Sequence, residues 1–330
     1  MRPLADLPSA PIVTHPSVWP WLDPIAQPAP PEPPGGWPTI SVVTPNFNYG
    51  GTVEATLRSV LAQRYPRLQH VVVDGGSTDD SLDRIARYRP HLSAVLTGSD
   101  RGQYPAINEG FAAATGDVCG WLNSDDIYLP WTLWQVGLIF ATFPQIQWIT
   151  GRPTQIQDGV IHDVGAFRPY PREFVRAGLY NQGDGGFWWI QQESCFWRRG
   201  LWEKVGGLDP SYPYAADFDL WQRFAAHADL CAVSTVLGGF SFRGGHNRSA
   251  ANWDKYVADV RRARAASLAD PATPHAVAAR ELERYRRLKR IPVVRSVAWR
   301  RMKLRELSGP TLTWDFDRSV YRLATARFYT

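Results

Sequence analysis

The stretch TISVVTPNFNYGGTVEATLRSVLAQRYPRLQHVVVDGGSTDDSLDRIARYRPHLSAVLT, residues 39–97, decides the fold. Short runs rich in β-branched residues, TISVVTP, LQHVVVD and SAVLT, predict three strands. Between them, TVEATLRSVLAQ places its apolar side chains on one helical face, and SLDRIARYR follows a turn rich in capping residues. The order strand, helix, strand, helix, strand predicts a mostly parallel sheet with helices on both faces.

The alternation continues toward the C-terminus. Residues 106–114 predict another helix, VCGWLNS (118–124) predicts another strand, and Pro130 marks the N-terminus of a helix over residues 131–143. There is no internal repeat. The sequence therefore predicts an α/β fold with a Rossmann-like sheet, formed by residues 38–250.

Two flanking segments differ from this core in composition. Residues 1–37 predict an extended arm, because the first 38 residues contain 12 prolines and cannot pack a core alone. Residues 251–330 predict a basic, mainly helical extension. From Asn252 onward the chain has 18 Lys or Arg and 8 Asp or Glu, a net charge of +10, whereas the part before Asn252 carries −5.

Composition narrows the class of protein. A hydrophobic content of 44% over 330 residues supports a large core. No run approaches the roughly 20 apolar residues of a membrane helix, and the start MRPLADLPSAPIV lacks the apolar stretch of a signal peptide. Cys119, Cys195 and Cys231 are too few and too far apart for a disulfide framework or a zinc site. We therefore expect a cytoplasmic protein, and no nucleic-acid-binding motif accompanies its basic charge.

Acidic residues stand where the predicted strands end. Asp74 ends HVVVD, Asp100 ends SAVLTGSD, and Asp125 and Asp126 follow VCGWLN; a further acidic pair lies in AADFDLW (215–221). Ligands of α/β sheets bind at the carboxyl ends of the strands. A carboxylate pair at that edge can hold a divalent cation against a diphosphate. These positions predict a nucleotide-diphosphate enzyme.

Four ordered motifs carry a family resemblance. They are PNFNYGGTVEATLRSVLAQRYP (45–66), VVVDGGSTDDS (71–81), DRGQYPAINEGFAAATGDVCGWLNSDDIYLP (100–130) and QQESCFWRRGLWEKVGGLDPSYPYAADFDLW (191–221). Together they closely resemble family 2 glycosyltransferases with the GT-A fold. The resemblance implies inverting transfer of a sugar from a nucleotide-diphosphate sugar, with UDP expected, to a hydroxyl of a glycan or glycolipid. It also implies assistance by Mg²⁺ or Mn²⁺ and a place in bacterial polysaccharide biosynthesis.

The resemblance assigns residues to the donor. Thr44, Pro45 and Asn46 would hold the nucleotide base, Asp74 would accept a hydrogen bond from the base ring, and Arg101 would bind diphosphate or sugar hydroxyls. Simpler interpretations stay open. Asn46 could be an ordinary loop residue, Asp74 a turn former before two glycines, and Arg101 the partner of Asp100 in a surface ion pair.

The segment LNSDD (122–126) occupies the position of the family's metal motif. The resemblance implies Asp126 as the direct metal ligand and Asp125 as a contact to the ribose or to the ion's outer shell. Asn123 stands where many relatives carry another Asp. The alternative for the acids is capping of the following helix. His246, one residue late for the family's F-R-x-H spacing, is a further metal candidate, with a structural role as the alternative.

On the acceptor side, the resemblance implies Asp217 as the catalytic base, because a sugar hydroxyl needs a positioned carboxylate to take its proton. The alternative is that Asp217 caps the helix that follows it. Asp219 would cap or orient. Glu193 and Trp188 are assigned to the acceptor side, Trp188 through stacking against a sugar ring.

The composition of the basic extension is compatible with more than one kind of binding partner. Residues 281–307, ELERYRRLKRIPVVRSVAWRRMKLREL, mix Arg and Lys with apolar residues, which is typical of peripheral binding to an anionic membrane and equally of a helical lid or dimer contact. Two rival functions are a catalytically inactive glycan-binding or membrane scaffold, and a sugar-phosphate nucleotidyltransferase. The latter needs a Lys-rich phosphate loop, and FNYGG (47–51) has no Lys or Arg.

Overall fold

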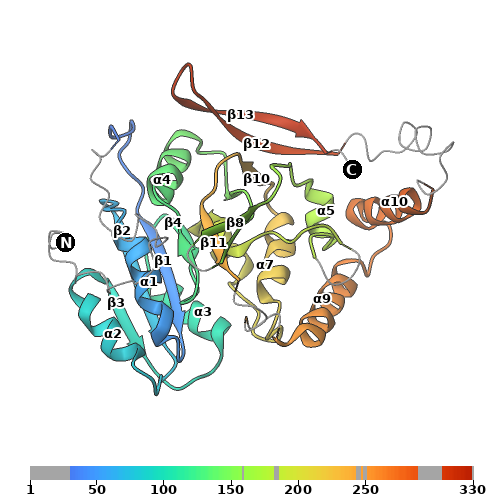
Figure 1. The fold of residues 1–330 in the computed structure, drawn as a ribbon. Coiled ribbons are helices and arrows are strands. Elements are labelled where there is room, and N and C mark those ends of the chain that lie inside the picture. Colours follow the sequence, from blue (N-terminus) through green and yellow to red (C-terminus); the bar gives the residue numbers. More distant parts are fainter. Residues whose placement is uncertain are drawn as a thin grey trace.

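The computed structural model describes residues 30–157, 160–181, 186–242, 247, 251–288 and 307–328. Its largest element is a nine-stranded sheet with the order β13-β12-β10-β6-β9-β4-β1-β2-β3 (Figure 1). These strands are β1 (Ile40–Asn46), β2 (Leu68–Asp74), β3 (Ala94–Thr97), β4 (Val118–Trp121), β6 (Trp148–Thr150), β9 (Cys195–Arg198), β10 (Leu230–Val233), β12 (Ser308–Asp315) and β13 (Val320–Arg327).

Most neighbours in this sheet run in parallel. β1 pairs in parallel with β2 and β4, β2 with β3, and β10 with β6 and β12. β9 is antiparallel to both of its neighbours, β4 and β6, and β13 is antiparallel to β12. The predicted fold class, a mostly parallel sheet flanked by helices, is confirmed.

Helices cover both faces of the sheet. They are α1 (Gly50–Leu61), α2 (Ser81–Tyr88), α3 (Gln103–Ala113), α4 (Thr132–Thr142), α5 (Arg172–Arg176), α6 (Arg199–Val205), α7 (Ala216–Ala225), α9 (Trp253–Ser267) and α10 (Pro274–Leu288). Val43 belongs to a core cluster with residues of α3, α6 and α7, whereas its neighbour Val42 packs with α1, α2 and α4. Because successive side chains of a strand alternate between faces, Val42 and Val43 pack into opposite clusters, and β1 is buried on both sides of the sheet.

The helices begin close to their predicted positions. Pro130 lies two residues before Thr132, the first residue of α4, and so precedes the helix rather than starting it. The three cysteines are buried and form no disulfide with one another.

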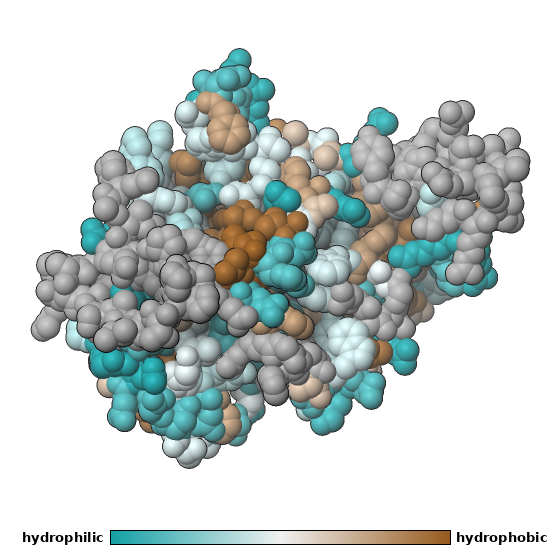
Figure 2. Space-filling view, viewed as in Figure 1, coloured by the Kyte–Doolittle hydropathy of each residue, from teal (hydrophilic) through white to brown (hydrophobic). Residues whose placement is uncertain are grey.

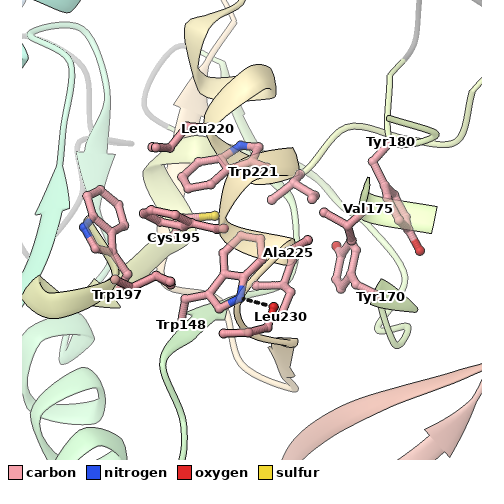
Figure 3. Packing of buried hydrophobic residues seen from close by; sticks show 14 of the residues in the cluster. Trp148, Tyr170, Val175, Tyr180, Cys195, Trp197, Leu220, Trp221, Ala225 and Leu230 are labelled. Carbon is pink, nitrogen blue, oxygen red and sulfur yellow. Dashed lines mark hydrogen bonds between the residues drawn. The ribbon is translucent and has the colours of Figure 1, made fainter. Parts of the chain in front are cut away.

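A group of tryptophans forms the centre of one core cluster (Figure 3). Trp221 of α7 stacks on Trp121 at 5.9 Å and on Trp148 at 5.6 Å between ring centroids. The indole Nε1 of Trp148 donates to the carbonyl of Ala228 at 3.2 Å. These rings fix α7 against the sheet, so they position whatever α7 carries at its N-terminus.

A smaller sheet of four strands has the order β5-β11-β7-β8. Its strands are β5 (Ile127–Tyr128), β7 (Thr154–Gln157), β8 (Val160–Val164) and β11 (Gly238–Ser241). The 3-10 turn η4 (Gln192–Ser194) packs against β4, β5 and β11. This places the loop that follows β4 between the two sheets.

The C-terminal extension is more closely joined to the core than its composition predicts. Helices α9 and α10 confirm helical structure over much of residues 251–288. After them, β12 pairs with β10 and forms a hairpin with β13, so the end of the chain completes the central sheet. The division at residue 250 therefore stays a prediction about sequence units, since residues on both sides of it share one sheet.

At the other end, the last residue of the predicted arm is part of the core. Trp37 packs edge-on against Tyr65 and Trp134, with ring centroids 5.8 Å and 5.1 Å away. Most of the arm, residues 1–29, lies outside the described residues.

Within the described part of the chain, no helix is both long and apolar enough to cross a membrane. On the face shown in Figure 2, hydrophobic residues gather near the middle, and hydrophilic residues cover α2 and α10 at its sides.

Candidate active site

A cleft of about 850 Å³ opens at the edge where β1, β2 and β4 end. One wall comes from these strand ends and from the loop after β3, and the other from residues 188–193, α7 and the start of α9. The predicted site residues that line it are Pro45, Asn46, Asp74, Arg101, Asp125, Asp126, Trp188, Glu193 and Asp217. The fold thus brings together residues that are up to 172 positions apart in the sequence.

Asp74 ends β2 and is fully buried. Its Oδ1 accepts from the backbone N–H groups of Gly76 and Ser77 at 2.9 and 2.8 Å. Its Oδ2 accepts from Asn46 Nδ2 and Ser77 Oγ, both at 2.7 Å. A carboxylate has about four lone-pair positions, and protein donors fill them here. This geometry favours the turn-forming interpretation of Asp74 over a contact to the base ring.

The turn also depends on Gly76, whose φ is +84° and where an added Cβ would lie 2.7 Å from the carbonyl oxygen of Gly98. Only glycine fits that conformation at that distance. The second glycine after Asp74 is therefore required by the loop itself.

Asn46 at the end of β1 is oriented by Asp74. Because a carboxylate accepts, the amide nitrogen of Asn46 must face it, and its Oδ1 is a buried acceptor with no partner among the described residues. The assignment of Thr44 to the nucleotide base stays a prediction. Thr44 Oγ1 lies 3.0 Å from Nε2 of the buried His70, and Thr44 is not among the residues that line the cleft.

Arg101 lies in the loop after β3 and does not pair with Asp100. Asp100 Oδ1 instead accepts from the backbone N–H of Gly102 at 2.8 Å. Arg101 Nη2 lies 3.2 Å from Glu109 of α3, in a pair whose side chains are 70% and 45% exposed. Such an exposed pair is weak, so Arg101 can exchange Glu109 for an anionic ligand at little cost.

The loop after β4 is organised around Asn123. Its Oδ1 accepts from Gln103 at 2.7 Å, and its Nδ2 donates to Asp126 Oδ2 at 3.1 Å and to Gln192 Oε1 at 3.3 Å. An Asp at this position could not donate to either acceptor. Asn123 thus supports the loop through donors that an Asp would lack.

Asp126 and Asp125 differ in accessibility. Asp126 is buried, and its Oδ1 accepts from the backbone N–H of Ser241 at 2.8 Å while its Oδ2 faces Asn123. Burial, followed by the charges of Asp125 and Glu193, raises the pKa of Asp126 well above its usual range. Asp125 is half-buried and lines the cleft. The alternative of an acidic helix cap does not hold, because α4 has Trp131 at its N-cap position.

Glu193 comes from η4 and faces the same acids. Gln191 donates to Glu193 Oε1, and also joins this turn to β7 through the carbonyl of Thr154 at 2.6 Å. Burial raises the pKa of Glu193 to about 7, and the charges of Asp125 and Asp217 act in the same direction. The cleft therefore contains a carboxyl group that can change its protonation near neutral pH.

Asp217 lies in the first turn of α7. The N-cap position belongs to Ala215, so Asp217 does not cap the helix. Tyr104 of α3 donates to Asp217 Oδ1 at 3.4 Å, and burial raises the pKa of Asp217 to about 6. Asp219 points elsewhere and pairs with Arg223 at 2.8 Å.

Trp188 is 43% exposed in the cleft and stacks on Trp189, with ring centroids 4.9 Å apart. His246 lies outside the described residues. Among those that are described, no group of three or more His, Cys, Asp or Glu side chains forms a metal cage.

Several lining residues were not predicted from the sequence. They are Phe47, Tyr104, Gln192, Trp253 and Tyr256. Phe47, 41% exposed directly after the β1 end, stands next to predicted residues and could have been found from its position. Trp253 and Tyr256 lie in α9, beyond the last motif, and only the fold brings them to the cleft.

Comparison with known proteins agrees with this architecture. Residues 41–176 match the model of glycosyl transferase family 2. An uncharacterized glycosyltransferase of Nostoc sp. is 39% identical over 106 residues, which are 31% of this chain and 33% of that protein. An uncharacterized glycosyltransferase of Mycobacterium tuberculosis is 29% identical over 209 residues, 63% of this chain and 76% of that one.

A PGL/p-HBAD biosynthesis glycosyltransferase of Mycobacterium tuberculosis is 28% identical over 190 residues, 55% of this chain and 68% of that protein. Among solved structures, residues 1–349 of TarS from S. aureus superimpose with a TM-score of 0.55 and 16% identity, covering 72% of this chain and 67% of that one. This likeness shows the fold. The same TarS fragment has been crystallised with UDP and with UDP-GlcNAc.

Proposed function

The chain belongs to the family 2 glycosyltransferases, and from that premise we propose that it moves a sugar from a nucleotide-diphosphate sugar to a hydroxyl of a glycan or glycolipid, with inversion. One observation carries this proposal. Asp217 of α7 lines the same cleft as the acidic loop after β4 and the ends of β1 and β2, and it comes from the opposite wall.

In the proposed reaction, Asp217 is the general base. With a pKa of about 6 it is mostly ionised at neutral pH, yet basic enough to take the proton of an acceptor hydroxyl as that oxygen attacks the anomeric carbon. The nucleoside diphosphate leaves on the other side of the sugar. A single displacement of this kind inverts the anomeric configuration.

The acidic loop fits a divalent cation. Beyond burial, the charge of Asp125 raises the pKa of both Asp126 and Glu193, so the three carboxyl groups lie close enough to interact, and a cation would favour their ionised forms. Mg²⁺ or Mn²⁺ prefers oxygen ligands and needs only one or two carboxylates when phosphate oxygens supply the rest. A bound cation would neutralise charge on the leaving diphosphate.

We revise the roles within that loop. Asp126 already accepts from Ser241 and Asn123 and is buried, which suits a residue that fixes the loop. Asp125 is more accessible, so we propose Asp125 as the direct contact to the cation and Asp126 as its support. This exchanges the assignments drawn from the motif alone.

For the donor, we propose that Asn46 and Phe47 hold the base and that Arg101 binds the diphosphate or the sugar. Asn46 Oδ1 is the buried acceptor without a described partner, and a nucleobase N–H could satisfy it after a small adjustment. UDP is the nucleotide we propose, the one with which the structurally similar TarS fragment was crystallised.

For the acceptor, we propose a lipid-linked saccharide at an anionic membrane surface. The support is the charge of the C-terminal extension, whose most basic stretch, residues 289–306, lies outside the described residues. Peripheral binding there would bring the cleft to membrane-borne acceptors.

Calorimetric titration of the protein with UDP, with and without Mn²⁺, tests donor binding, and NMR of the product formed from an α-linked donor tests transfer. Binding that strengthens with Mn²⁺ and a β-linked product are expected. A protein that binds UDP but transfers no sugar would favour the inactive scaffold, and one that forms nucleotide sugar from a sugar phosphate would be a nucleotidyltransferase.

A further inference from the structure

The start of α9 supplies an aromatic surface to the cleft that no motif of the core contains. Trp253 and Tyr256 stack with ring centroids 5.4 Å apart and an interplanar angle of 24°, and both line the cleft. Trp253 remains 39% exposed. A large aromatic surface that is exposed beside a proposed catalytic base indicates a binding site for a ligand.

The position of this surface is fixed by packing of α9 on α7, which Figure 1 shows side by side. Val260 and Ala263 of α9 form a buried cluster with Phe218 of α7 and with Ala215, the N-cap residue of that helix. Asp259 accepts from the backbone N–H of Tyr214 at 2.9 Å. The aromatic pair is therefore held in a constant relation to the N-terminus of α7.

That terminus carries Asp217. Burial and the negative charge of Asp217 raise the pKa of Tyr256, so the phenol stays protonated next to the carboxylate. Asp217, the group that would take the acceptor proton, therefore lies at the same end of the cleft as the stacked rings. The strand ends that we assign to the nucleotide form the other wall.

The chemistry of this end fits a saccharide ring. An indole face packs well against a flat apolar surface, and the surrounding polar side chains can satisfy hydroxyls at the ring's edge. Asn247 and Tyr214 line the same cleft, together with Gln192. The hydroxyls of a saccharide can share hydrogen bonds with these polar groups, whereas an alkyl chain has no donor or acceptor to offer them.

We propose that Trp253, supported by Tyr256, is the platform on which the acceptor's sugar ring stacks, and that the acceptor hydroxyl therefore belongs to a saccharide. This inference rests on the proposed function, since it names the acceptor class of the same site. It makes the C-terminal extension part of the acceptor site and not an appendage to it.

Saturation-transfer NMR on the full-length protein with UDP and Mn²⁺ present tests this, using methyl pyranosides of glucose, galactose, mannose and N-acetylglucosamine as probes. At least one glycoside should receive saturation on its ring C–H protons. Its dissociation constant should rise at least ten-fold in Trp253→Ala and less in Trp253→Phe. Phe316→Ala removes a ring that is 85% exposed at the tip of the β12–β13 hairpin, and it should change nothing.

Calorimetry of UDP with Mn²⁺ on the same proteins separates this inference from the proposed function. Unchanged UDP affinity in Trp253→Ala, with glycoside binding lost, supports the platform. Equal glycoside affinity in Trp253→Ala and the unsubstituted protein overturns it, as does binding of octanol or 4-hydroxybenzoate with no binding of any pyranoside. Failure of the unsubstituted protein to bind UDP would instead overturn the proposed function.

Discussion

The hydroxyl of Tyr104 donates a hydrogen bond to Asp217 Oδ1 at 3.4 Å and joins α3 to α7 across the cleft. This contact favours the ionised form of Asp217, whereas burial favours the protonated form and prevails, so the pKa of Asp217 is raised to about 6. The balance of burial against this bond and against the hydrogen bonds from the backbone N–H groups of Phe218 and Asp217 sets the pH at which the proposed base becomes active.

The acidic limb of the pH profile should therefore report Asp217. Because only the ionised carboxylate accepts a proton, kcat/KM should rise with pH and reach half its maximum near pH 6. Tyr104→Phe removes the donor and should move this limb upward by up to about one pH unit. Tyr321→Phe is the matched control, since that hydroxyl donates to Gln135 outside the cleft. A limb that stays in place in Tyr104→Phe would mean that another group governs it.

Asp217→Asn keeps the shape of the side chain and removes its basicity. Turnover should fall by roughly 10² to 10⁴, while the affinity for UDP with Mn²⁺ stays the same, because the loss concerns proton transfer and not donor binding. Initial rates and calorimetry on the same preparation measure the two effects. Asp219→Asn, in the pair with Arg223, is the neighbouring control. Near-normal turnover in Asp217→Asn would assign the base elsewhere.

The two acids after β4 should respond differently to substitution. Asp125→Asn should weaken Mn²⁺-dependent UDP binding at least ten-fold and leave the ligand-free melting temperature nearly unchanged. Asp126→Asn places an amide nitrogen near Asn123 Nδ2 or the N–H of Ser241, both of which donate, so it should lower the melting temperature. Loss of Mn²⁺-dependent binding in Asp126→Asn alone would restore Asp126 as the direct ligand.

Local pattern was sufficient for the first half of the fold. β1 and β2 are short runs rich in β-branched residues that alternate with amphipathic helices, so the periodicity and the Gly-rich turns predict the order of the elements. The β12–β13 hairpin was missed, because the charge of the extension suggested helices and the short alternation in TLTWD is weak evidence without its partner strand. Its pairing with β10 is a long-range contact.

The candidate site, like the fold, could be predicted from the sequence only in part. Strand ends identified Asp125, Asp126 and Asp74 as neighbours, since parallel strands bring their carboxyl ends to one edge. The internal bonds of Asp74 could be anticipated from the D-G-G-S turn, but the choice between turn and ligand required the positions of Asn46 and Ser77. Tyr104 lies 113 residues from Asp217 in the sequence, and no local pattern joins them.

The proposed membrane binding of the basic stretch, residues 289–306, can be tested without truncating the chain. A truncation before α9 would also delete β12, which pairs with β10, so neutralising substitutions are preferable. Full-length protein should sediment with vesicles containing anionic lipid and detach as salt rises, since screening acts within about 10 Å at 0.1 M. Replacement of Lys289, Arg290, Arg300, Arg301 and Lys303 by Gln should abolish sedimentation. Equal sedimentation of both proteins would remove the membrane from the proposal.

Glu193 should make stability depend on pH. Its folded-state pKa of about 7 lies above the ordinary value of 4.5, so the folded protein holds a proton that the unfolded chain releases. The stabilising contribution is complete below pH 4.5 and is lost as pH rises through 7. The carboxyl group of Glu193 faces those of Asp125, Asp126 and Asp217. All three acids are present both in the unsubstituted protein and in the Glu193→Gln variant that is compared with it.

Glu193→Gln retains the acceptor for Gln191 but carries no charge. Its unfolding free energy relative to the unsubstituted protein should therefore increase between pH 5 and pH 8, by about 2 kcal/mol for a shift of this size. Urea unfolding in EDTA at several pH values measures the difference, and EDTA keeps cations from stabilising the ionised form. Glu203→Gln, on α6 and outside the residues that line the cleft, should show no such trend. A Glu193→Gln protein whose relative stability is the same at both pH values would show that Glu193 is ionised in the folded state throughout this range.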